Sequence, residues 1–252
     1  MASGPESVLG KALVILRSFG PDEPVLMLAE VARRTGIPKP TVHRMARDLV
    51  DLHLLDTVEG GYRLSSGMFE LGMRASAERA LLELAMPFLQ DLYERTHETV
   101  HLGISDDLAV VYVGKIGGHR QAKSPSRIGG RMPLHCTAIG KVLLAHAGPE
   151  ERASVLTGPL ERRTPRTVVA PGLLSRQLDS ILESGVAFER EESALGLLCV
   201  AAPVLDVDGR AALAAISVAG PIGRFRPEMH GTAVRAAAQA LGSVLARRRT
   251  IQ

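Results

Sequence analysis

The apolar positions of residues 37–50 follow the spacing i, i+3, i+4, i+7 of a buried helical stripe. They are Val42, Met45, Ala46 and Leu49. Prolines at positions 38 and 40 are best tolerated in a first helical turn, so the pattern predicts a helix that begins near Lys39. Residues 27–38 predict a short helix that ends at Gly36. Two short helices joined by a tight turn are typical of a helix-turn-helix motif.

The flanking patterns predict the rest of a winged domain. A first helix, with Ser7 as its N-cap, has one apolar face. That face contains Val8, Ala12, Ile15, Leu16 and Phe19. Residues 54–58 and 62–64 predict a β-hairpin with Gly60-Gly61 at its turn. Met27 stands where a capping Ser, Thr or Asp is usual, which costs about 1 kcal/mol.

The remainder of the chain changes from helical to mixed patterns. Residues 66–80 predict a helical linker, and residues 81–93 predict a helix in which Pro87 causes either a kink or a new helix start. Later hairpins and helices predict an antiparallel sheet flanked by helices, an α+β fold. The hairpins are residues 99–116 and 198–219, and the helices are residues 137–146, 149–156, 173–184 and 227–247. We therefore expect domains at 1–65 and 81–252, joined by the linker at 66–80.

The charge distribution indicates a DNA-binding surface. The formal net charge is only +3, but five cations and no acid lie between Glu30 and Asp48. Such a cluster attracts phosphates, whereas the alternative is a solvated helical face. The candidate DNA-binding residues are Arg34, Lys39, Pro40, Thr41, His43, Arg44, Arg47 and, on the wing, Arg63. For Arg33 and Arg34, phosphate contact and simple solvation of the first helix remain open.

The sequence contains few features of a membrane protein, an enzyme or a metal-binding protein. The longest apolar run, residues 197–205, is too short for a membrane span, and no leader pattern opens the chain, so we expect a cytoplasmic protein. No nucleophile-elbow, P-loop, zinc-protease or dinucleotide-binding motif is present, so we expect neither an enzyme nor a cofactor. Both cysteines are expected to be buried thiols. A regulatory metal stays open as an alternative because zinc takes such ligands. Its candidate ligands are His101, His135, Cys136 and Cys199.

Six ordered blocks of sequence resemble the isocitrate lyase regulator (IclR) family of bacterial transcription factors. They are SVLGKALVILRSF, LAEVARRTGIPKPTVHRMARDLV, YRLSSGMFELG, RMPLHCTAIGKVLLA, EREESALGLLCVAAPV and AAISVAGP, and they extend from residue 7 to residue 221. The resemblance implies an N-terminal winged helix-turn-helix domain, a linker helix and a C-terminal effector-binding domain of GAF-like α/β fold. It also implies dimers that pair into tetramers.

The effector site is expected where a strand leads into the helix at residue 137, because a helix N-terminus accepts a carboxylate. The resemblance implies effector contacts from this turn, from an acidic residue and from two later strands. These positions are Ala138, Ile139, Glu189, Cys199 and Ser217. Ala219 replaces a hydroxyl that some relatives carry, and Ile139 is bulky. Both features favour a larger, partly apolar or aromatic acid over a two-carbon oxoacid.

The expected function is sequence-specific transcriptional regulation, with repression as the expected direction. The expected partners are double-stranded operator DNA, a small organic acid that modulates operator affinity, and further copies of the chain in a homodimer or homotetramer. The alternative is a metal- or thiol-responsive regulator that uses the C-terminal His and Cys residues. A catalytic domain with a DNA-binding leader is a third and weaker hypothesis.

Overall fold

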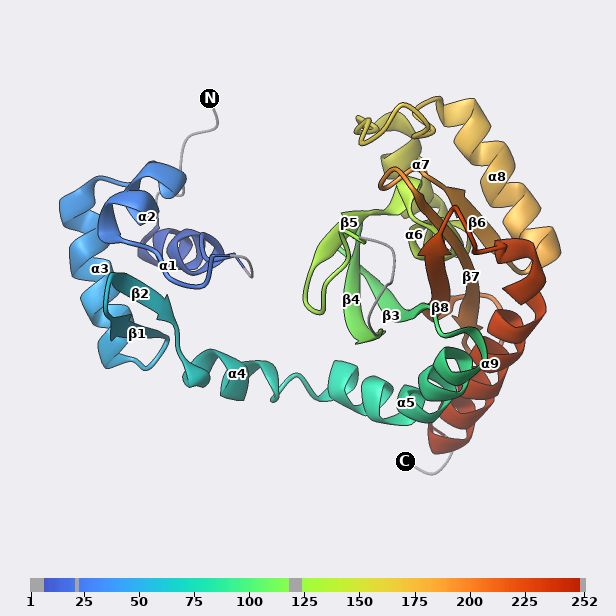
Figure 1. Cartoon of the computed structure of the whole chain (residues 1–252), viewed down its shortest axis with the longest axis horizontal. Coiled ribbons are helices and arrows are strands. Elements are labelled where there is room, and N and C mark those ends of the chain that lie inside the picture. Colours follow the sequence, from blue (N-terminus) through green and yellow to red (C-terminus); the bar gives the residue numbers. More distant parts are fainter. Residues whose placement is uncertain (1–6, 21–22, 118–123, 250–252) are drawn as a thin grey trace. The chain divides into compact units, whose positions relative to one another are not determined.

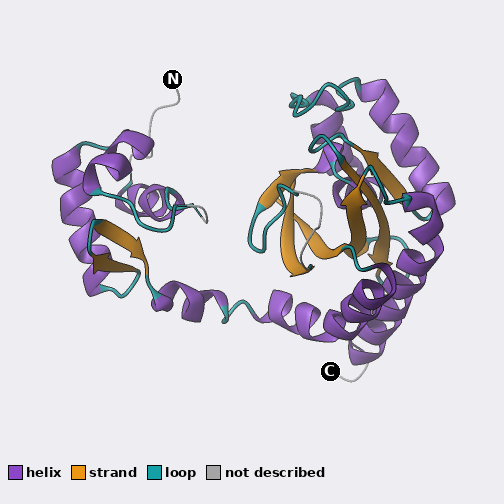
Figure 2. Cartoon of the chain, in the orientation of Figure 1, coloured by secondary structure: helices purple, strands orange, loops and turns teal. Residues whose placement is uncertain are grey.

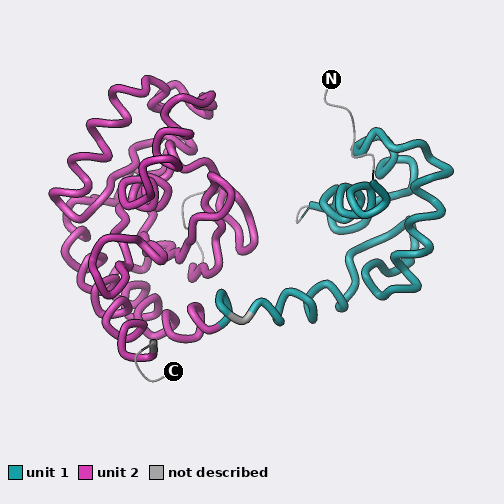
Figure 3. The backbone as a smooth tube through the Cα atoms, turned by 180° about the vertical axis from the view of Figure 1, so that it is seen from behind, with its two compact units in different colours: residues 1–79 teal, residues 80–252 magenta. Residues whose placement is uncertain are grey.

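The computed structural model describes residues 7–20, 23–117 and 124–249 of the 252-residue chain. The chain divides into two compact units, residues 1–79 and 80–252 (Figure 3). The first unit is a small helical domain with one hairpin, and the second is a sheet covered by helices (Figure 2). The expected α+β class is therefore confirmed. No helix in the described part of the chain is long and apolar enough to cross a membrane.

The described residues of the first unit up to Leu64 contain three helices and a two-stranded wing (Figure 1). These elements are α1 (Val8–Arg17), α2 (Leu28–Thr35), α3 (Lys39–Asp51), β1 (Leu55–Val58) and β2 (Gly61–Leu64). The hydroxyl of Ser7 accepts a hydrogen bond from the Gly10 N–H at 3.0 Å, as an N-cap does. The expectation that Val8 faces inward is wrong, because its side chain is 71% exposed. The domain core packs against α1 only from Ala12 onward, so the first turn lies outside it.

The helix-turn-helix ends and begins where the sequence predicts. Gly36 ends α2 in the left-handed conformation, with φ of 67°. Met27 precedes α2 without any side-chain cap. Helix α3 begins at Lys39, with Pro40 in its first turn. The predicted stripe of α3 forms the buried side of the helix, which leaves its opposite side free of the core.

The wing is tied to the chain before α2. Strand β1 pairs with β2 so that Val58 lies opposite Gly61, and the turn is therefore Glu59-Gly60 rather than the expected Gly60-Gly61. The N–H groups of Leu26 and Tyr62 donate to each other's carbonyl oxygens, both at 2.9 Å. A Cβ atom on Gly61 would lie 2.2 Å from the Leu26 carbonyl oxygen. This close approach of two backbones requires glycine there.

The segment between the wing and the sheet is helical. Three residues separate the end of helix α4 (Ser66–Gly72) from the start of α5 (Ser76–Thr96). Helix α5 continues through Pro87, so the alternative of a new helix start at that proline is wrong. A proline inside a helix costs about 3 kcal/mol. Three buried residues on both sides of it, Ala85, Leu89 and Leu92, pack against the sheet and offset that cost.

In the described residues, the second unit is built on one antiparallel sheet of six strands in the order β5-β4-β3-β8-β7-β6. The strands are β3 (Thr99–Asp106), β4 (Ala109–Ile116), β5 (Arg131–Pro133), β6 (Ala187–Arg190), β7 (Leu197–Leu205) and β8 (Ala212–Pro221). Among the described residues of this unit, four α-helices follow β5 in the chain, three of them before β6 and one after β8. They are α6 (Ala138–Ala145), α7 (Pro149–Thr157), α8 (Pro171–Ser184) and α9 (Pro227–Arg249). The edge strand β6 was not among the predicted elements.

Two apolar cores lie on opposite faces of this sheet. Helices α5 and α9 pack on one face, and α6 and α8 pack on the other. Successive residues of a strand point to opposite faces. On β8, Ile216 and Val218 therefore contact the α5–α9 side, while Ala215 and Ala219 contact the α6–α8 side. Ser217 shares the α6–α8 face by the same alternation.

Candidate functional site

The outward side of α3 is a compact basic surface. The side chains of Lys39, His43, Arg44 and Arg47 are exposed there, as is Pro40, while Thr41 is half-buried. In the described part of the chain, the cations Lys39, Arg44 and Arg47 form no ion pair. Their charges are therefore available to a phosphate backbone.

Arg34 has a different environment from the cations of α3. Its guanidinium contacts the carboxylates of Glu30, at 2.6 Å, and Glu23, and it donates to the Ser18 carbonyl oxygen at 3.1 Å. Arg33 also contacts Glu30, at 2.6 Å. The two arginines lower the pKa of Glu30 to about 2 through hydrogen bonds, with Arg33 the larger cause. For Arg33 and Arg34, these contacts favour simple solvation of α2, the first helix of the helix-turn-helix, over contact with phosphate.

On the wing, Arg63 is exposed and pairs with Asp56 of the facing strand, Nε to Oδ2 at 3.0 Å. An exposed ion pair of this kind contributes only about 0–1 kcal/mol to the stability of the folded protein. Its guanidinium has donors that Asp56 does not use, so Arg63 keeps the capacity for a second acceptor.

In the second unit, strand register brings the predicted effector residues onto one face. Glu189 of β6 lies opposite Cys199 of β7, and Cys199 lies opposite Ala219 of β8. Ser217 of β8 lies opposite His101 of β3. All five predicted effector residues line one cavity beneath the start of α6. They are Ala138, Ile139, Glu189, Cys199 and Ser217.

The N-terminus of α6 forms one wall of this cavity. Thr137 caps the helix, its hydroxyl accepting from the Gly140 N–H at 3.0 Å. The N–H groups of Ala138 and Ile139 precede the first intrahelical donor, Lys141, and are the ones a bound anion can accept from. A Cβ atom on Gly140 would lie 2.3 Å from the Leu134 carbonyl oxygen, so glycine permits this close packing.

Glu189 is the most unusual polar group of the cavity because it is fully buried. Its Oε1 accepts three hydrogen bonds, from the Glu192 N–H at 2.9 Å, the Ser193 N–H at 3.0 Å and the Ser193 hydroxyl at 3.1 Å. Its Oε2 has no hydrogen-bond partner among the described residues. Burial raises the pKa of Glu189, although the Cys199 thiol and Ser193 act in the opposite direction. A carboxylate oxygen without a partner favours a ligand that donates a hydrogen bond.

His101 and Ser217 form a polar pair on the floor of the cavity. The Ser217 hydroxyl lies 3.4 Å from Nδ1 of His101, and the Ser126 hydroxyl lies 2.7 Å from its Nε2. Burial, followed by the charge of Lys115, lowers the pKa of His101 to about 3, so the imidazole is neutral at pH 7. The ring of Tyr112 meets that of His101 edge to face, with centroids 5.3 Å apart.

The cavity is small and carries no cation. Its volume is about 10 Å³, which is enough for about one water molecule. Its apolar lining includes Met132, Ile139 and Leu197. No Lys or Arg lines it in the described part of the chain. The N-terminus of α6 is a source of positive potential for a bound carboxylate.

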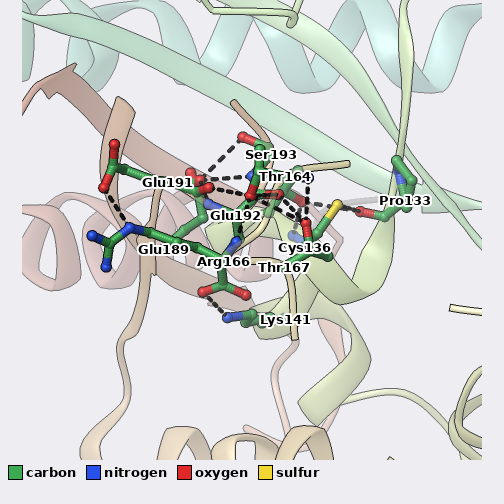
Figure 4. A network of polar contacts seen from close by, with 12 residues as sticks. Pro133, Cys136, Lys141, Thr164, Arg166, Thr167, Glu189, Glu191, Glu192 and Ser193 are labelled. Carbon is green, nitrogen blue, oxygen red and sulfur yellow. Dashed lines mark hydrogen bonds and ion pairs between the residues drawn. The ribbon is translucent and has the colours of Figure 1, made fainter. Parts of the chain in front are cut away.

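A network of polar contacts continues from the cavity into the turn after β6 (Figure 4). The Lys141 ammonium lies 2.5 Å from Oε1 of Glu192, and both side chains are buried. The hydroxyl of Thr167 donates to the Glu192 carbonyl oxygen at 2.7 Å, and that of Thr164 donates to the Glu191 carbonyl oxygen at 2.6 Å. Residues 189–193 are thereby held by contacts with Lys141 of α6 and with Thr164 and Thr167.

The metal alternative finds no support in this geometry. Within the described ranges, no three His, Cys, Asp or Glu side chains converge as metal ligands. The His135 ring contacts the Glu161 carbonyl oxygen at 2.9 Å instead. A thiol response is not favoured either, because burial raises the pKa of Cys136 to about 12 and that of Cys199 well above its usual value. Both are neutral thiols at pH 7.

The sequence did not predict several residues that line the effector cavity, including Tyr112 and His101. Tyr112 was not singled out at all, and His101 was considered only as a metal ligand. The role of His101 follows from its position opposite Ser217 in the sheet. These two residues are 116 positions apart in the chain, so their pairing depends on which strands lie side by side. Alternation within β3 alone shows which residues share a face, but not which strand lies beside them.

Comparison with known proteins assigns both units to one family. Residues 8–59 match the IclR helix-turn-helix domain, and residues 73–243 match the bacterial transcriptional regulator IclR C-terminal domain. The chain is 36% identical to the HTH-type transcriptional regulator KdgR of Escherichia coli K12 over 230 residues, covering 89% of this chain and 86% of that protein. It is 30% identical to the transcriptional repressor IclR of the same organism over 229 residues, covering 89% and 83%.

Among solved structures, an IclR homolog from Microbacterium hydrocarbonoxydans complexed with 4-hydroxybenzoate is similar to the chain with a TM-score of 0.87 and 28% identity. That match covers 94% of this chain and 98% of the homolog. The Thermotoga maritima IclR structure matches with a TM-score of 0.76 and 26% identity, covering 94% and 98%. The basic helix α3 and the buried cavity under α6 are both consistent with the family that these matches indicate. The chain belongs to the IclR family of DNA-binding bacterial transcriptional regulators.

Proposed function

We propose that this regulator binds its operator through α3 and that a small organic acid, bound in the cavity beneath α6, changes its operator affinity. The observation that carries the proposal is the convergence of five residues from four separate segments on one buried cavity. The proposal gives the second unit a binding role rather than a catalytic one. It places the protein in the cytoplasm, where operator DNA is available.

The DNA contact is proposed for the exposed side of α3. Arg44 and Arg47 are the side chains for base edges in the major groove, because Arg forms paired hydrogen bonds with guanine. Lys39 lies at the helix start and is proposed to contact phosphate. Arg63 on the wing is proposed to contact the backbone or the minor groove. Two copies would present two α3 helices to half-sites about one helical turn apart, or a multiple of that distance.

The chemistry of the cavity supports an aromatic or partly apolar hydroxy acid. The N–H groups of Ala138 and Ile139 are suited to its carboxylate. Glu189 Oε2 lacks a donor, and a ligand hydroxyl would supply one. Met132, Tyr112 and Ile139 provide apolar surface for a ring. The similar homolog that was solved with 4-hydroxybenzoate makes this acid the natural first probe.

The size of the cavity connects binding to regulation. An aromatic acid is far larger than about 10 Å³, so it binds only to a conformation in which α6 or the strands beneath it have moved. A ligand shifts an equilibrium by its differential affinity for the two conformations. We propose that the enlarged conformation has lower operator affinity, which makes the protein a repressor that the acid releases. Homodimers or homotetramers would transmit the change to paired half-sites.

The test is a titration of an operator duplex, selected from a random library with the wild-type protein, in the presence of 4-hydroxybenzoate. The acid should lower operator affinity. Benzoate lacks the hydroxyl and should require about tenfold higher concentration for the same effect. If neither acid changes operator affinity, and removing metal with a chelator does, the organic-acid proposal fails and the metal-sensor alternative replaces it.

A further inference from the structure

A second hollow, distinct from the effector cavity, lies between α8 and the edge strand β6. Its volume is about 610 Å³, and it shares no lining residue with the effector cavity. Ile181 of α8 and Phe188 of β6 supply its apolar surface. Strand β6 is at the edge of the sheet in the described part of the chain, so no further strand covers this side. The hollow is large enough for a small metabolite.

Two residues that line this hollow each have a buried acceptor atom without a hydrogen-bond partner among the described residues. These atoms are Oε2 of Glu192 and Oε1 of Gln177. Glu192 is only 5% exposed, and its other carboxylate oxygen is the one that Lys141 contacts. A buried acceptor without a donor has lost its hydration without compensation. A ligand that donates hydrogen bonds here compensates for that loss.

Two guanidinium groups lie at the rim of the hollow, and each is paired with a carboxylate outside the lining. They belong to Arg166 and Arg190, with side chains that are 65% and 54% exposed. Arg166 contacts Glu191 through Nε at 2.8 Å, and Arg190 contacts Glu228 through one terminal nitrogen. Each guanidinium has five N–H donors, so most remain for a ligand. With Lys141, the lining carries three cations against one carboxylate.

We propose that this hollow is a binding site for a small hydroxy acid. The carboxylate of the ligand lies against Arg166 and Arg190, and its hydroxyl groups donate to Glu192 Oε2 and Gln177 Oε1. The charge of the lining selects hydroxyl over ammonium donors, because Lys141 already neutralises Glu192 and a further cation would be repelled. The lining residues of this site are not among those proposed for the DNA contact or for the effector cavity.

Isothermal titration calorimetry of the full-length protein with three probes tests the chemistry. Gluconate carries one carboxylate and several hydroxyl groups and should bind. Sorbitol lacks the carboxylate and hexanoate lacks the hydroxyl groups, so each should bind about tenfold more weakly or not at all. Absence of gluconate binding, or equal affinity for the three probes, overturns the inference.

Single substitutions locate the bound probe. Arg166→Ala and Arg190→Ala should each weaken gluconate binding about tenfold, since each removes a charge-assisted contact. Arg176→Ala is the control, because Arg176 is an exposed arginine on α8, the helix beside the hollow, and does not line the hollow. Ser180→Phe should abolish binding by filling the space. Circular dichroism and thermal unfolding establish that each variant is folded.

Two outcomes would assign the hollow differently. If Ser217→Ala weakens gluconate binding while Arg166→Ala and Arg190→Ala do not, the acid occupies the effector cavity and the inference is wrong. If Ser180→Phe lowers the sedimentation coefficient of an oligomer and wild-type protein binds no gluconate, the hollow is a contact between subunits. Either result is independent of whether the regulator responds to 4-hydroxybenzoate.

Discussion

The ammonium of Lys141 lies 2.5 Å from Oε1 of Glu192, and this buried ion pair joins two walls of the effector cavity. Lys141 is on α6, whose first residues line the cavity. The backbone N–H of Glu192 donates to Glu189 Oε1 at 2.9 Å, which is part of the opposite wall. The pair therefore fixes α6 against the turn after β6, and any enlargement of the cavity acts on it.

Replacing one partner of this pair should destabilise the second unit strongly. Lys141→Met leaves the Glu192 carboxylate buried without its cation, which lowers the free energy of unfolding by about 3–5 kcal/mol. The double variant Lys141→Met/Glu192→Leu should recover most of that loss, because it buries no unpaired charge. Urea unfolding at pH 7, followed by circular dichroism, measures both. Equal losses in the single and double variants would contradict the role given to the charge.

The basic side of α3 should dominate operator recognition. Arg44→Ala should weaken operator binding by about 1–3 kcal/mol if Arg44 contacts a base edge. Lys39→Ala should instead weaken binding to all duplexes alike and reduce its salt dependence. Titrations at two salt concentrations distinguish the two effects. The matched control is Arg34→Ala, whose guanidinium is held by Glu30 and Glu23 and whose loss should leave the salt dependence unchanged. Unchanged affinity in an Arg44→Ala/Arg47→Ala double variant would exclude α3 as the recognition helix.

Ser217→Ala should weaken the response to the acid while leaving operator binding without acid intact. Losing one hydrogen bond to a charged ligand group costs about 1.5–3 kcal/mol. Ser105→Ala on β3 is the control, because Ser105 is exposed and contacts Glu151 outside the cavity. The concentration of 4-hydroxybenzoate that releases half of the operator measures the effect. A metal sensor predicts the reverse, with Cys199→Ser altering the response and Ser217→Ala leaving it unchanged.

His101 should make stability depend on pH below its ordinary pKa. Burial lowers the folded-state pKa from 6.5 to about 3, so the unfolded chain binds a proton that the folded chain does not. The contribution of His101 to stability is therefore fully present above pH 6.5 and is lost as the pH falls toward 3. The slope approaches about 1.4 kcal/mol per pH unit. Urea unfolding at pH 7 and pH 5 should show this loss in wild type and not in His101→Gln. An equal pH dependence in both proteins would rule it out.

Local patterns predicted most helices and their ends. The stripe of α3 and its start at Lys39 follow from the apolar spacing and the position of two prolines, because both depend on residues within a few turns. The helix end at Gly36 and the N-cap Ser7 have the same local origin, as does the helix start near Thr137. The five effector residues were predicted from the family resemblance. In the structure they line one cavity.

Other features depended on neighbours that are distant in the chain. Helix α5 continues through Pro87 because its buried side packs on the sheet, and Val8 is exposed because the domain core begins at Ala12. Arg34 is held by Glu23, eleven residues earlier in the chain, whereas the cations of α3 are not paired in this way within the described residues. Spacing along one segment contains no information about these contacts.

The sequence by itself determined the helix-turn-helix, the α+β class and the family, since these depend on local periodicity and ordered motifs. Only the tertiary structure decided which buried groups face each other. It brought Glu189 opposite Cys199 and His101 opposite Ser217. Within the described residues, it left Oε2 of Glu189 and Oε2 of Glu192 without hydrogen-bond donors, and these two residues line separate cavities. The physical reason is that strand register and helix packing are set by the whole apolar core, so the environment of a side chain is a property of the assembled sheet.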